Sequence, residues 1–157
     1  MTTPPATGVT LRDVWESDLP VFFEHQRDPV ANEMAAFPAR DEQAFAEHWE
    51  RVKTNETGIQ RTILADDDVA GHIVSWLDGG DRMVGYWVGR EFWDRGIASE
   101  ALKQFVGVVE ERPLTASVAE HNVASLRVLE KCGFVAVGGP RPPGPDGIRE
   151  IILKLGA

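Results

Sequence analysis

Cysteine and basic residues are scarce in this sequence. One cysteine among 157 residues excludes an internal disulfide. The 16 lysines and arginines are outnumbered by 25 aspartates and glutamates, which gives a net charge of −9. Broad nucleic-acid binding depends on clustered Lys and Arg that displace counterions. The composition therefore argues against a nucleic-acid partner.

Membrane, export and metal signals are also missing. No apolar run is long enough to span a bilayer, and the opening MTTPPATG lacks the basic and apolar regions of a signal peptide. The HxH and HExxH spacings typical of metal sites do not occur. We therefore expect a cytoplasmic protein with no metal and no membrane partner.

The apolar content is sufficient for one buried core. A chain of 157 residues with 43% hydrophobic residues fits a single domain. We expect this domain to span residues 1–157, with residues 1–8 as a flexible lead. No internal repeat or linker divides it.

Alternating and continuous apolar runs predict seven strands. The turns DDD and DGGD after the second and third of them predict two hairpins. The expected strand ranges are 9–14, 58–65, 69–77, 82–88, 114–119, 134–138 and 148–155.

Amphipathic periodicity predicts helices in the intervals. Their expected ranges are 17–28, 41–55, 97–111 and 122–133, with a further helical turn at 32–37. Ser17, Asp41 and Asn122 are the expected N-caps, and Pro113 and Gly133 the expected stops. In the helix at 97–111, the residues expected to face the core are Ala98, Ala101, Leu102, Phe105, Val108 and Val109.

This order of elements predicts an α+β fold. A mixed, mostly antiparallel sheet of about seven strands should carry helices on both faces. The helix between the fourth and fifth strands permits one parallel crossover there. A doubly wound parallel sheet does not fit, because the other strands follow one another without helical crossovers.

The segment WDRGIAS, residues 93–99, separates the fourth strand from the next helix. The first amides of a helix lack intrahelical partners and carry partial positive charge, so a phosphate or pyrophosphate is a natural ligand there. Gly96 allows close approach of the backbone, Ala98 and Ser99 leave the first turn uncrowded, and Arg95 could add a charged contact. The alternative is an ordinary strand-to-helix turn. Neither the Walker loop nor the three-glycine dinucleotide pattern is present.

Two segments resemble a known family. YWVGREFWDRGIASEAL resembles motif A of the GCN5-related N-acetyltransferases, whose loop reads Arg or Gln, two residues, Gly, one residue, then Gly or Ala. Gly96 and Ala98 match this pattern, whereas Trp93 stands at its first position. AEHNVASLRVLEKCGF resembles the Asn-x-x-Ser…Glu-Lys-x-Gly-Phe segment of the RimJ/RimL-like branch, the ribosomal-protein N-terminal acetyltransferases. The resemblance extends from about Val9 to Leu155.

The resemblance implies that acetyl-coenzyme A (acetyl-CoA) is the co-substrate. The fourth strand would splay from the fifth, and its end would offer backbone groups to the pantetheine arm and an amide, that of Val88, to the thioester carbonyl. The loop amides would hold the pyrophosphate, and Asn122 would contact the arm from the other wall. The implied cofactor-binding residues are Trp87, Val88, Arg95, Gly96, Ile97, Ala98, Ser99 and Asn122.

The implied reaction is direct attack of a primary amine on the thioester in a ternary complex. Many members of the family use a tyrosine in the last helix as the general acid, and the matching position here is Leu129. Ser125 is therefore the candidate catalytic acid, and its alternative is a helical serine bonded to a carbonyl one turn back. The base stays unassigned among His72, His121, Glu33, Asp81 and a water chain.

The resemblance leaves two classes of acetyl acceptor, a protein N-terminus and a small-molecule amine. Dimers are common in the resembling branch, so a homodimer is a further expectation. One alternative is a non-catalytic acyl-CoA-binding or sensing module on the same fold, because the helical tyrosine and a carboxylate in the fourth strand are both missing. A different anion-binding α+β protein is the third hypothesis.

Overall fold

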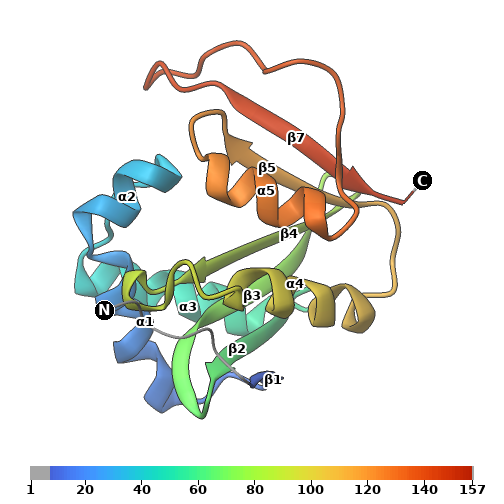
Figure 1. Ribbon diagram of the computed structural model, residues 1–157. Coiled ribbons are helices and arrows are strands. Elements are labelled where there is room, and N and C mark those ends of the chain that lie inside the picture. Colours follow the sequence, from blue (N-terminus) through green and yellow to red (C-terminus); the bar gives the residue numbers. More distant parts are fainter. Residues whose placement is uncertain (1–7, 157) are drawn as a thin grey trace.

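The fold is a mixed α+β sheet of seven strands, seen here in a computed structural model that describes residues 8–156 (Figure 1). The spatial order of the strands is β1-β2-β3-β4-β5-β7-β6. Most of the predicted lead, residues 1–7, lies outside the described residues. The strands are β1 (Val9–Arg12), β2 (Ile59–Ala65), β3 (Asp68–Asp78), β4 (Asp81–Val88), β5 (Leu114–Ala119), β6 (Val135–Ala136) and β7 (Glu150–Leu155). The predicted fold class is confirmed.

Every neighbouring pair of strands is antiparallel except β4 and β5. The parallel pair is joined only at its start, where Arg82 lies opposite Leu114 and Met83 opposite Thr115. Beyond these two residue pairs the strands diverge. The splayed parallel pair expected from the sequence is therefore present, and it leaves an opening in the middle of the sheet.

Helices cover both faces of the sheet (Figure 1). One face carries α1 (Leu19–Gln26) and α3 (Glu42–Thr54), with α2 (Pro29–Ala35) beside the opening. The other face carries α4 (Ile97–Val108) and α5 (Val123–Lys131). Two short 3-10 turns, η1 (Glu16–Asp18) and η2 (Arg90–Phe92), precede α1 and α4.

Local chemistry explains most of the element boundaries. The Asp41 side chain accepts from Ala44 N (2.7 Å) and the Asn122 side chain from Ser125 N (3.2 Å), as their predicted capping roles require. Gly133, with φ +93°, follows α5 in the left-handed conformation that ends a helix. Both hairpin turns have positive φ at their two central positions, which fits their Asp-Asp and Gly-Gly sequences.

Two helix predictions were wrong. Ser17 does not cap α1, because it lies inside η1, and Asp18 takes the N-cap position instead. Val108 does not face the core: it is 39% exposed, whereas Val109 is fully buried. The reason is that α4 ends at Val108, well before Pro113, so the next residue leaves the helical period and turns inward.

Two neighbouring rows of residues cross the antiparallel strands and point to opposite faces, since side chains alternate along a strand. The first row is Arg12, Thr62, His72 and Trp87, and it faces α1 and α3. The second row is Leu11, Ile63, Gly71 and Val88, and it faces α4. The rows run from the sheet edge to the end of β4, where the opening begins.

Candidate active site

The loop between β4 and α4 forms an open cradle. Gly96 is the N-cap of α4 with φ +76°, and a Cβ built on it would meet nothing within 4 Å. No side chain caps the helix, so the first amides of its twelve residues point into this space. Ile97 is 1% exposed and anchors the first turn in the core. The cradle therefore suits an anion such as a pyrophosphate.

Trp93 fixes the loop to the strand before it. Its indole Nε1 donates to the carbonyl oxygen of Val88 (2.9 Å). The N–H of Gly89 donates to Ala70 on β3, so backbone alternation turns the Val88 amide and carbonyl the other way, toward β5. Trp93 thus anchors the loop.

The Arg95 side chain turns away from the cradle. Its guanidinium lies 3.9 Å from the Asp66 carboxylate and 5.6 Å from the centre of the Phe92 ring, and the side chain is 17% exposed. It does not line the pocket described next. At this position the loop offers its backbone to a ligand, whereas the side chain holds the loop against the β2–β3 turn.

A pocket of about 670 Å³ passes through the opening in the sheet. Tyr86 and Trp87, adjacent in β4 and therefore on opposite faces, both line it. All the site residues predicted from the sequence lie on its wall except Arg95. The lining residues are Ala31, Met34, Ala35, Tyr86, Trp87, Val88, Phe92, Trp93, Asp94, Gly96, Ile97, Ala98, Ser99, Asn122, Ala124, Ser125, Arg127, Val128 and Lys131.

Two hydroxyl groups meet among the residues that line this pocket. The Tyr86 hydroxyl and Ser125 Oγ lie 2.6 Å apart, and either can be the donor. Burial raises the pKa of Tyr86 to about 12, although the hydrogen bond from Ser125 lowers it, so the phenol is protonated at neutral pH. No bond from Ser125 Oγ to a carbonyl one turn back is formed within residues 8–156. The pair can donate a proton to a group in the pocket.

Sequence reasoning missed three residues of this site. Tyr86 escaped notice because its partner, Ser125, is 39 positions away and belongs to another element. Arg127 and Lys131 place two cations on the pocket wall. A signal for them existed, since residues 124, 127, 128 and 131 follow helical spacing from the Asn122 cap and share one stripe of α5.

The base candidates from the sequence lie off the pocket wall. His72 packs against the rings of Phe22 (4.7 Å) and Trp49 (5.0 Å), and burial lowers its pKa to about 3. His121 Nε2 donates to the carbonyl oxygen of Glu33 (2.9 Å), which joins the β5–α5 turn to α2. Asp81 begins β4, at the end of the strand remote from the opening.

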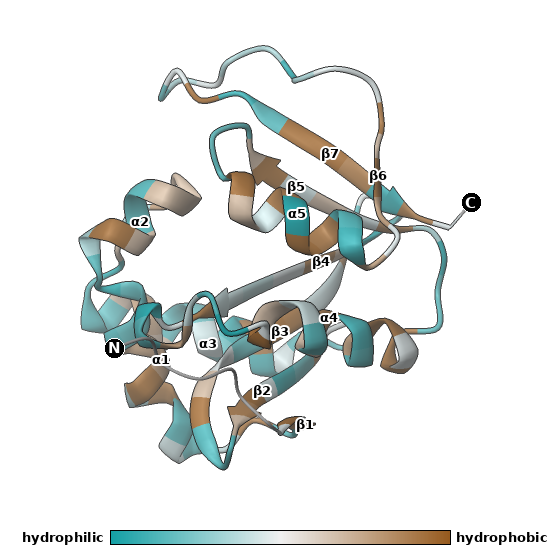
Figure 2. Cartoon of the chain, viewed as in Figure 1, coloured by the Kyte–Doolittle hydropathy of each residue, from teal (hydrophilic) through white to brown (hydrophobic). Residues whose placement is uncertain are grey.

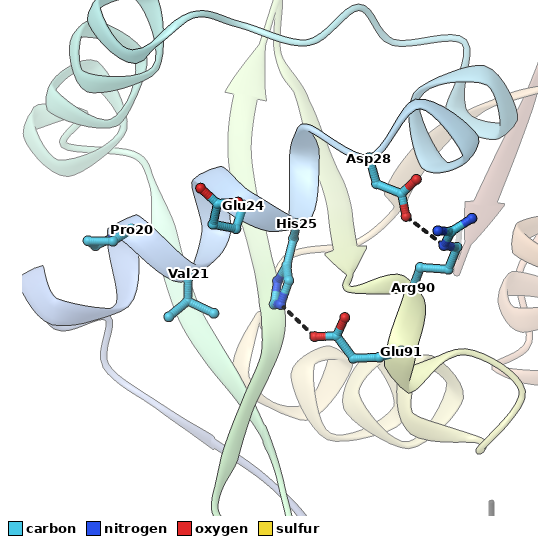
Figure 3. A pocket seen from close by; sticks show the side chains of 7 residues that line it. All are labelled: Pro20, Val21, Glu24, His25, Asp28, Arg90 and Glu91. Carbon is cyan, nitrogen blue, oxygen red and sulfur yellow. Dashed lines mark ion pairs between the residues drawn. The ribbon is translucent and has the colours of Figure 1, made fainter.

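A second, shallower cavity of about 480 Å³ lies beside η2 (Figure 3). His25 Nε2 lies 3.6 Å from Glu91, and Arg90 Nε pairs with Asp28 at 2.8 Å. Burial lowers the pKa of His25, and the nearby Glu91 opposes this shift. A Cβ on Gly89 would lie 2.6 Å from the His25 ring. These contacts clamp the segment before the cradle onto the end of α1.

Two other kinds of site are missing from the part of the chain that the structure describes. Residues 8–156 hold no group of three His, Cys, Asp or Glu side chains that could bind a metal ion. No helix among them is long and apolar enough to cross a membrane.

Comparisons with known proteins agree with this geometry. Residues 9–135 match the family of acetyltransferase (GNAT) domains. No curated protein sequence matches the chain significantly. Among solved structures, spermidine N-acetyltransferase from Vibrio cholerae, in complex with CoA and spermine, is 12% identical with a TM-score of 0.81, covering 94% of each chain.

Two further structures share the fold. RimL, a ribosomal L7/L12 α-N-protein acetyltransferase in complex with CoA, is 16% identical with a TM-score of 0.78, covering 96% of this chain and 95% of its own. An aminoglycoside acetyltransferase in complex with CoA is 18% identical with a TM-score of 0.74, covering 92% of this chain and 94% of its own. At these identities the structural likeness concerns the fold.

Proposed function

The chain belongs to the acetyltransferase (GNAT) family, and from this premise we propose that it is a single-domain N-acetyltransferase that moves an acetyl group from acetyl-CoA to a primary amine. The observation that carries the proposal is the pocket through the splayed β4–β5 pair, whose lining includes both the anion cradle and the Tyr86–Ser125 hydroxyl pair. Three similar structures contain CoA. The Asn122 and Ser125 spacing supports the RimJ/RimL-like branch within the family.

The donor side of the pocket fits acetyl-CoA. The amides of residues 95–99 would hold the pyrophosphate, because Gly96 leaves the cradle open and α4 adds its dipole. Arg127 and Lys131 would add charge-assisted contacts to its phosphates. The Val88 amide and the Asn122 side chain lie along the opening, where the amides of the pantetheine arm need partners. The Trp87 amide and carbonyl face β3, so this residue lines the pocket with its side chain.

The chemistry needs two proton transfers. Acetyl-CoA supplies a thioester whose acyl carbon is open to attack. The neutral amine forms the new C–N bond as the C–S bond breaks, and the nitrogen gives its proton to water. Ser125 donates its hydroxyl proton to the leaving sulfur, and Tyr86 holds Ser125 in place and passes its own proton to it. The proton that the amine released to water then returns to Tyr86, which restores the pair.

The first experiment tests donor binding. Acetyl-CoA at ~100 times its dissociation constant should stabilise the protein by roughly 2.7 kcal/mol, measured as a rise in Tm. Gly96→Glu should abolish the rise, since the new carboxylate enters the cradle. Gly147→Glu is the matched control, because Gly147 has φ +77° against +76° for Gly96 and equally open surroundings. No stabilisation of the wild type at millimolar acetyl-CoA would refute the proposal.

The second experiment tests turnover. A panel of peptides, polyamines and aminoglycosides is incubated with acetyl-CoA, and released thiol is measured. Stabilisation by acetyl-CoA without thiol release from any amine would favour the non-catalytic acyl-CoA-binding module instead.

Variants of the hydroxyl pair test the assignment of the acid. We expect Ser125→Ala to lower kcat about 100-fold and Tyr86→Phe about tenfold, because a positioned general acid contributes on the order of 10²–10⁴. The KM for acetyl-CoA should stay within twofold in both variants. Wild-type kcat in Ser125→Ala would remove Ser125 from the mechanism.

A further inference from the structure

The short helix α2 forms one wall of the pocket and depends on other segments for its position. Ala31, Met34 and Ala35 line the pocket, and the end of α2 nearer to α5 is coloured hydrophobic in Figure 2. A helix of seven residues is marginally stable by itself, so tertiary contacts must hold it. Ala36, which follows α2, has φ +54°, a conformation that residues other than glycine keep only where their surroundings fix it. The contacts at the two ends of α2 therefore decide where this wall stands.

The C-terminal end of α2 is tied to elements beside the opening in the sheet. His121 Nε2 donates to the carbonyl oxygen of Glu33, in the last turn of α2 (2.9 Å). His121 directly precedes Asn122, which caps α5 and lines the pocket. The Phe37 ring, just beyond α2, meets the Trp87 ring of β4 edge-on, with 5.9 Å between the ring centres.

The N-terminal end of α2 is tied to η2 by a single carboxylate, that of Asp28 (Figure 3). Asp28 Oδ1 accepts from the Val30 N–H (3.0 Å) and so caps α2. The other oxygen, Oδ2, forms an ion pair with Arg90 Nε (2.8 Å). The Asp28 side chain is 16% exposed, so water and salt screen this pair less than they screen a pair on the open surface.

Arg90 lies in the segment that leads from β4 to the anion cradle. It comes two residues after Val88, whose amide faces the opening, and shortly before Phe92 and Trp93, which line the pocket. Gly96, the N-cap of α4, follows in the same loop. A ligand that fixes this loop also restricts Arg90, and through the ion pair it restricts the start of α2.

We propose that Asp28 is a positioning residue for acetyl transfer, which through Arg90 fixes the α2 wall of the pocket to the loop that holds acetyl-CoA. Local opening of α2 must then either break the ion pair or displace a loop that the ligand holds. Bound acetyl-CoA therefore suppresses this opening. The inference rests on the proposed function and adds to it two residues that lie off the pocket wall.

The first test compares amide hydrogen exchange with and without saturating acetyl-CoA, in peptides that cover α2 and the first turn of α4. In the wild type, acetyl-CoA should slow exchange in both regions, by at least about fivefold in α2. Arg90 is 52% exposed, so Arg90→Gln should fold. This variant should reduce the effect in α2 to less than about twofold and leave the effect in α4 unchanged.

The matched control for Arg90→Gln is Arg27→Gln. Arg27 also forms an ion pair (3.0 Å), but both side chains are exposed and its partner Glu24 lies three residues before it. Loss of such a pair has little effect on stability. Acetyl-CoA should therefore slow exchange in α2 of Arg27→Gln as much as in the wild type.

Two further variants separate positioning from capping. Asp28→Asn keeps an oxygen for the Val30 N–H, since asparagine caps helices as well as aspartate does, but it removes the charge that faces Arg90. Exchange in α2 of this variant should respond to acetyl-CoA as weakly as in Arg90→Gln. Arg90→Lys keeps the cation and should restore the wild-type response. If Asp28 served only as a cap, Asp28→Asn would behave like the wild type.

A kinetic measurement connects the ion pair to the reaction. Its probe is the amine of the panel that the wild type uses fastest, at saturating acetyl-CoA. Arg90→Gln should raise the KM for this amine about fivefold and change kcat less than about twofold, because a displaced wall weakens contacts made equally in the ground state and the transition state. Arg27→Gln should leave both values unchanged.

The outcomes separate the inference from the proposed function. Slower exchange in α4 but not in α2 of the wild type would overturn the inference and leave acetyl-CoA binding in place. The same holds for a wild-type response of α2 in Arg90→Gln or Asp28→Asn, and for an unchanged KM in Arg90→Gln. No response in either region, together with no rise in Tm at millimolar acetyl-CoA, would overturn the proposed function and the inference with it.

Discussion

The two faces of the sheet are built from different side chains. The buried residues between the sheet and α4–α5 are mostly aliphatic, such as Ile97, Leu102 and Leu129, and Phe105 and Phe134 are the aromatic ones among them. The core under α1 and α3 is aromatic and holds histidines, with His72 between Phe22 and Trp49. Four of the six buried side-chain atoms without hydrogen-bond partners among residues 8–156 belong to residues of this second face, His25, Gln26, His72 and Trp87, and the other two belong to Arg95 and Thr115.

The difference indicates that the two faces have different tasks. The aliphatic face holds the helix that forms the cradle, so its task is rigid packing. The aromatic face borders the side of the pocket that α2 lines and keeps polar atoms out of water at a cost in free energy. Substitutions on the two faces should therefore have effects of different size and different pH dependence.

A substitution where β3 and β4 pair closely should cause the largest loss of stability. A Cβ on Gly71 would lie 2.0 Å from the Trp87 carbonyl oxygen and 2.9 Å from Val88 Cα, so Gly71→Ala must push β3 and β4 apart. We expect a loss of about 3 kcal/mol or more in the free energy of unfolding, measured by urea titration. A loss below 1 kcal/mol would show that the two strands can separate without damage to either face.

Removal of the buried Arg12–Asp18 ion pair on the aromatic face should cause the second largest loss of stability. Asp18 accepts from Arg12 (2.7 and 2.9 Å), from Thr62 (2.7 Å) and from the Trp15 N–H (2.8 Å). Asp18→Ala leaves these donors unpaired and should cost about 3 kcal/mol. Asp13→Ala is the control: Asp13 is 87% exposed with Arg61 at 3.5 Å, and such surface pairs contribute about 0–1 kcal/mol. Equal losses in the two variants would contradict the special role of the buried pair.

The contribution of the Asp18 carboxylate to the free energy of unfolding should depend on pH. Burial would raise its pKa, but the hydrogen bonds from Arg12, Thr62 and Trp15 together lower it below the ordinary value. The folded protein therefore binds this proton less readily than the unfolded chain. The stabilisation is present above pH ~4 and is lost as the pH falls further.

Protonation of His72 should lower the free energy of unfolding at a higher pH than protonation of Asp18 does. Its folded pKa of about 3 lies below the unfolded value of about 6.5, so its stabilising effect is complete above pH ~6.5 and declines as the pH falls toward 3. Linkage gives a loss of about 2 kcal/mol between pH 7 and pH 5. His72→Phe should lack this loss in urea titrations at the two pH values. An unchanged pH dependence in the variant would place the titration elsewhere.

The smallest effect is expected on the aliphatic face. Gly107 lies in α4, and a Cβ there would meet nothing within 4 Å. Gly107→Ala should stabilise the protein by about 0.5–1 kcal/mol, because alanine loses less backbone entropy in a helix. A decrease in Tm would mean that this end of α4 is packed more tightly than its open surroundings indicate.

Much of the fold could be predicted because it depends on local chemistry. The Asp41 and Asn122 caps, the Gly133 stop and both hairpin turns are properties of a few neighbouring residues. The errors at Ser17 and Val108 arose where a distant partner decided the outcome. Asp18 is held by Arg12 and Thr62, and Val109 is drawn into the core after the helix has ended.

The sequence by itself determined the cradle, since a strand, a short loop with Gly96 and the start of a helix follow one another within one segment of the chain. Only the tertiary structure decided what faces that cradle. The Tyr86–Ser125 pair and the α2 wall of the pocket come from elements that meet where β4 parts from β5. The physical reason is that caps and turns depend on short-range hydrogen bonds, whereas a pocket through a sheet depends on how separate elements pack around it.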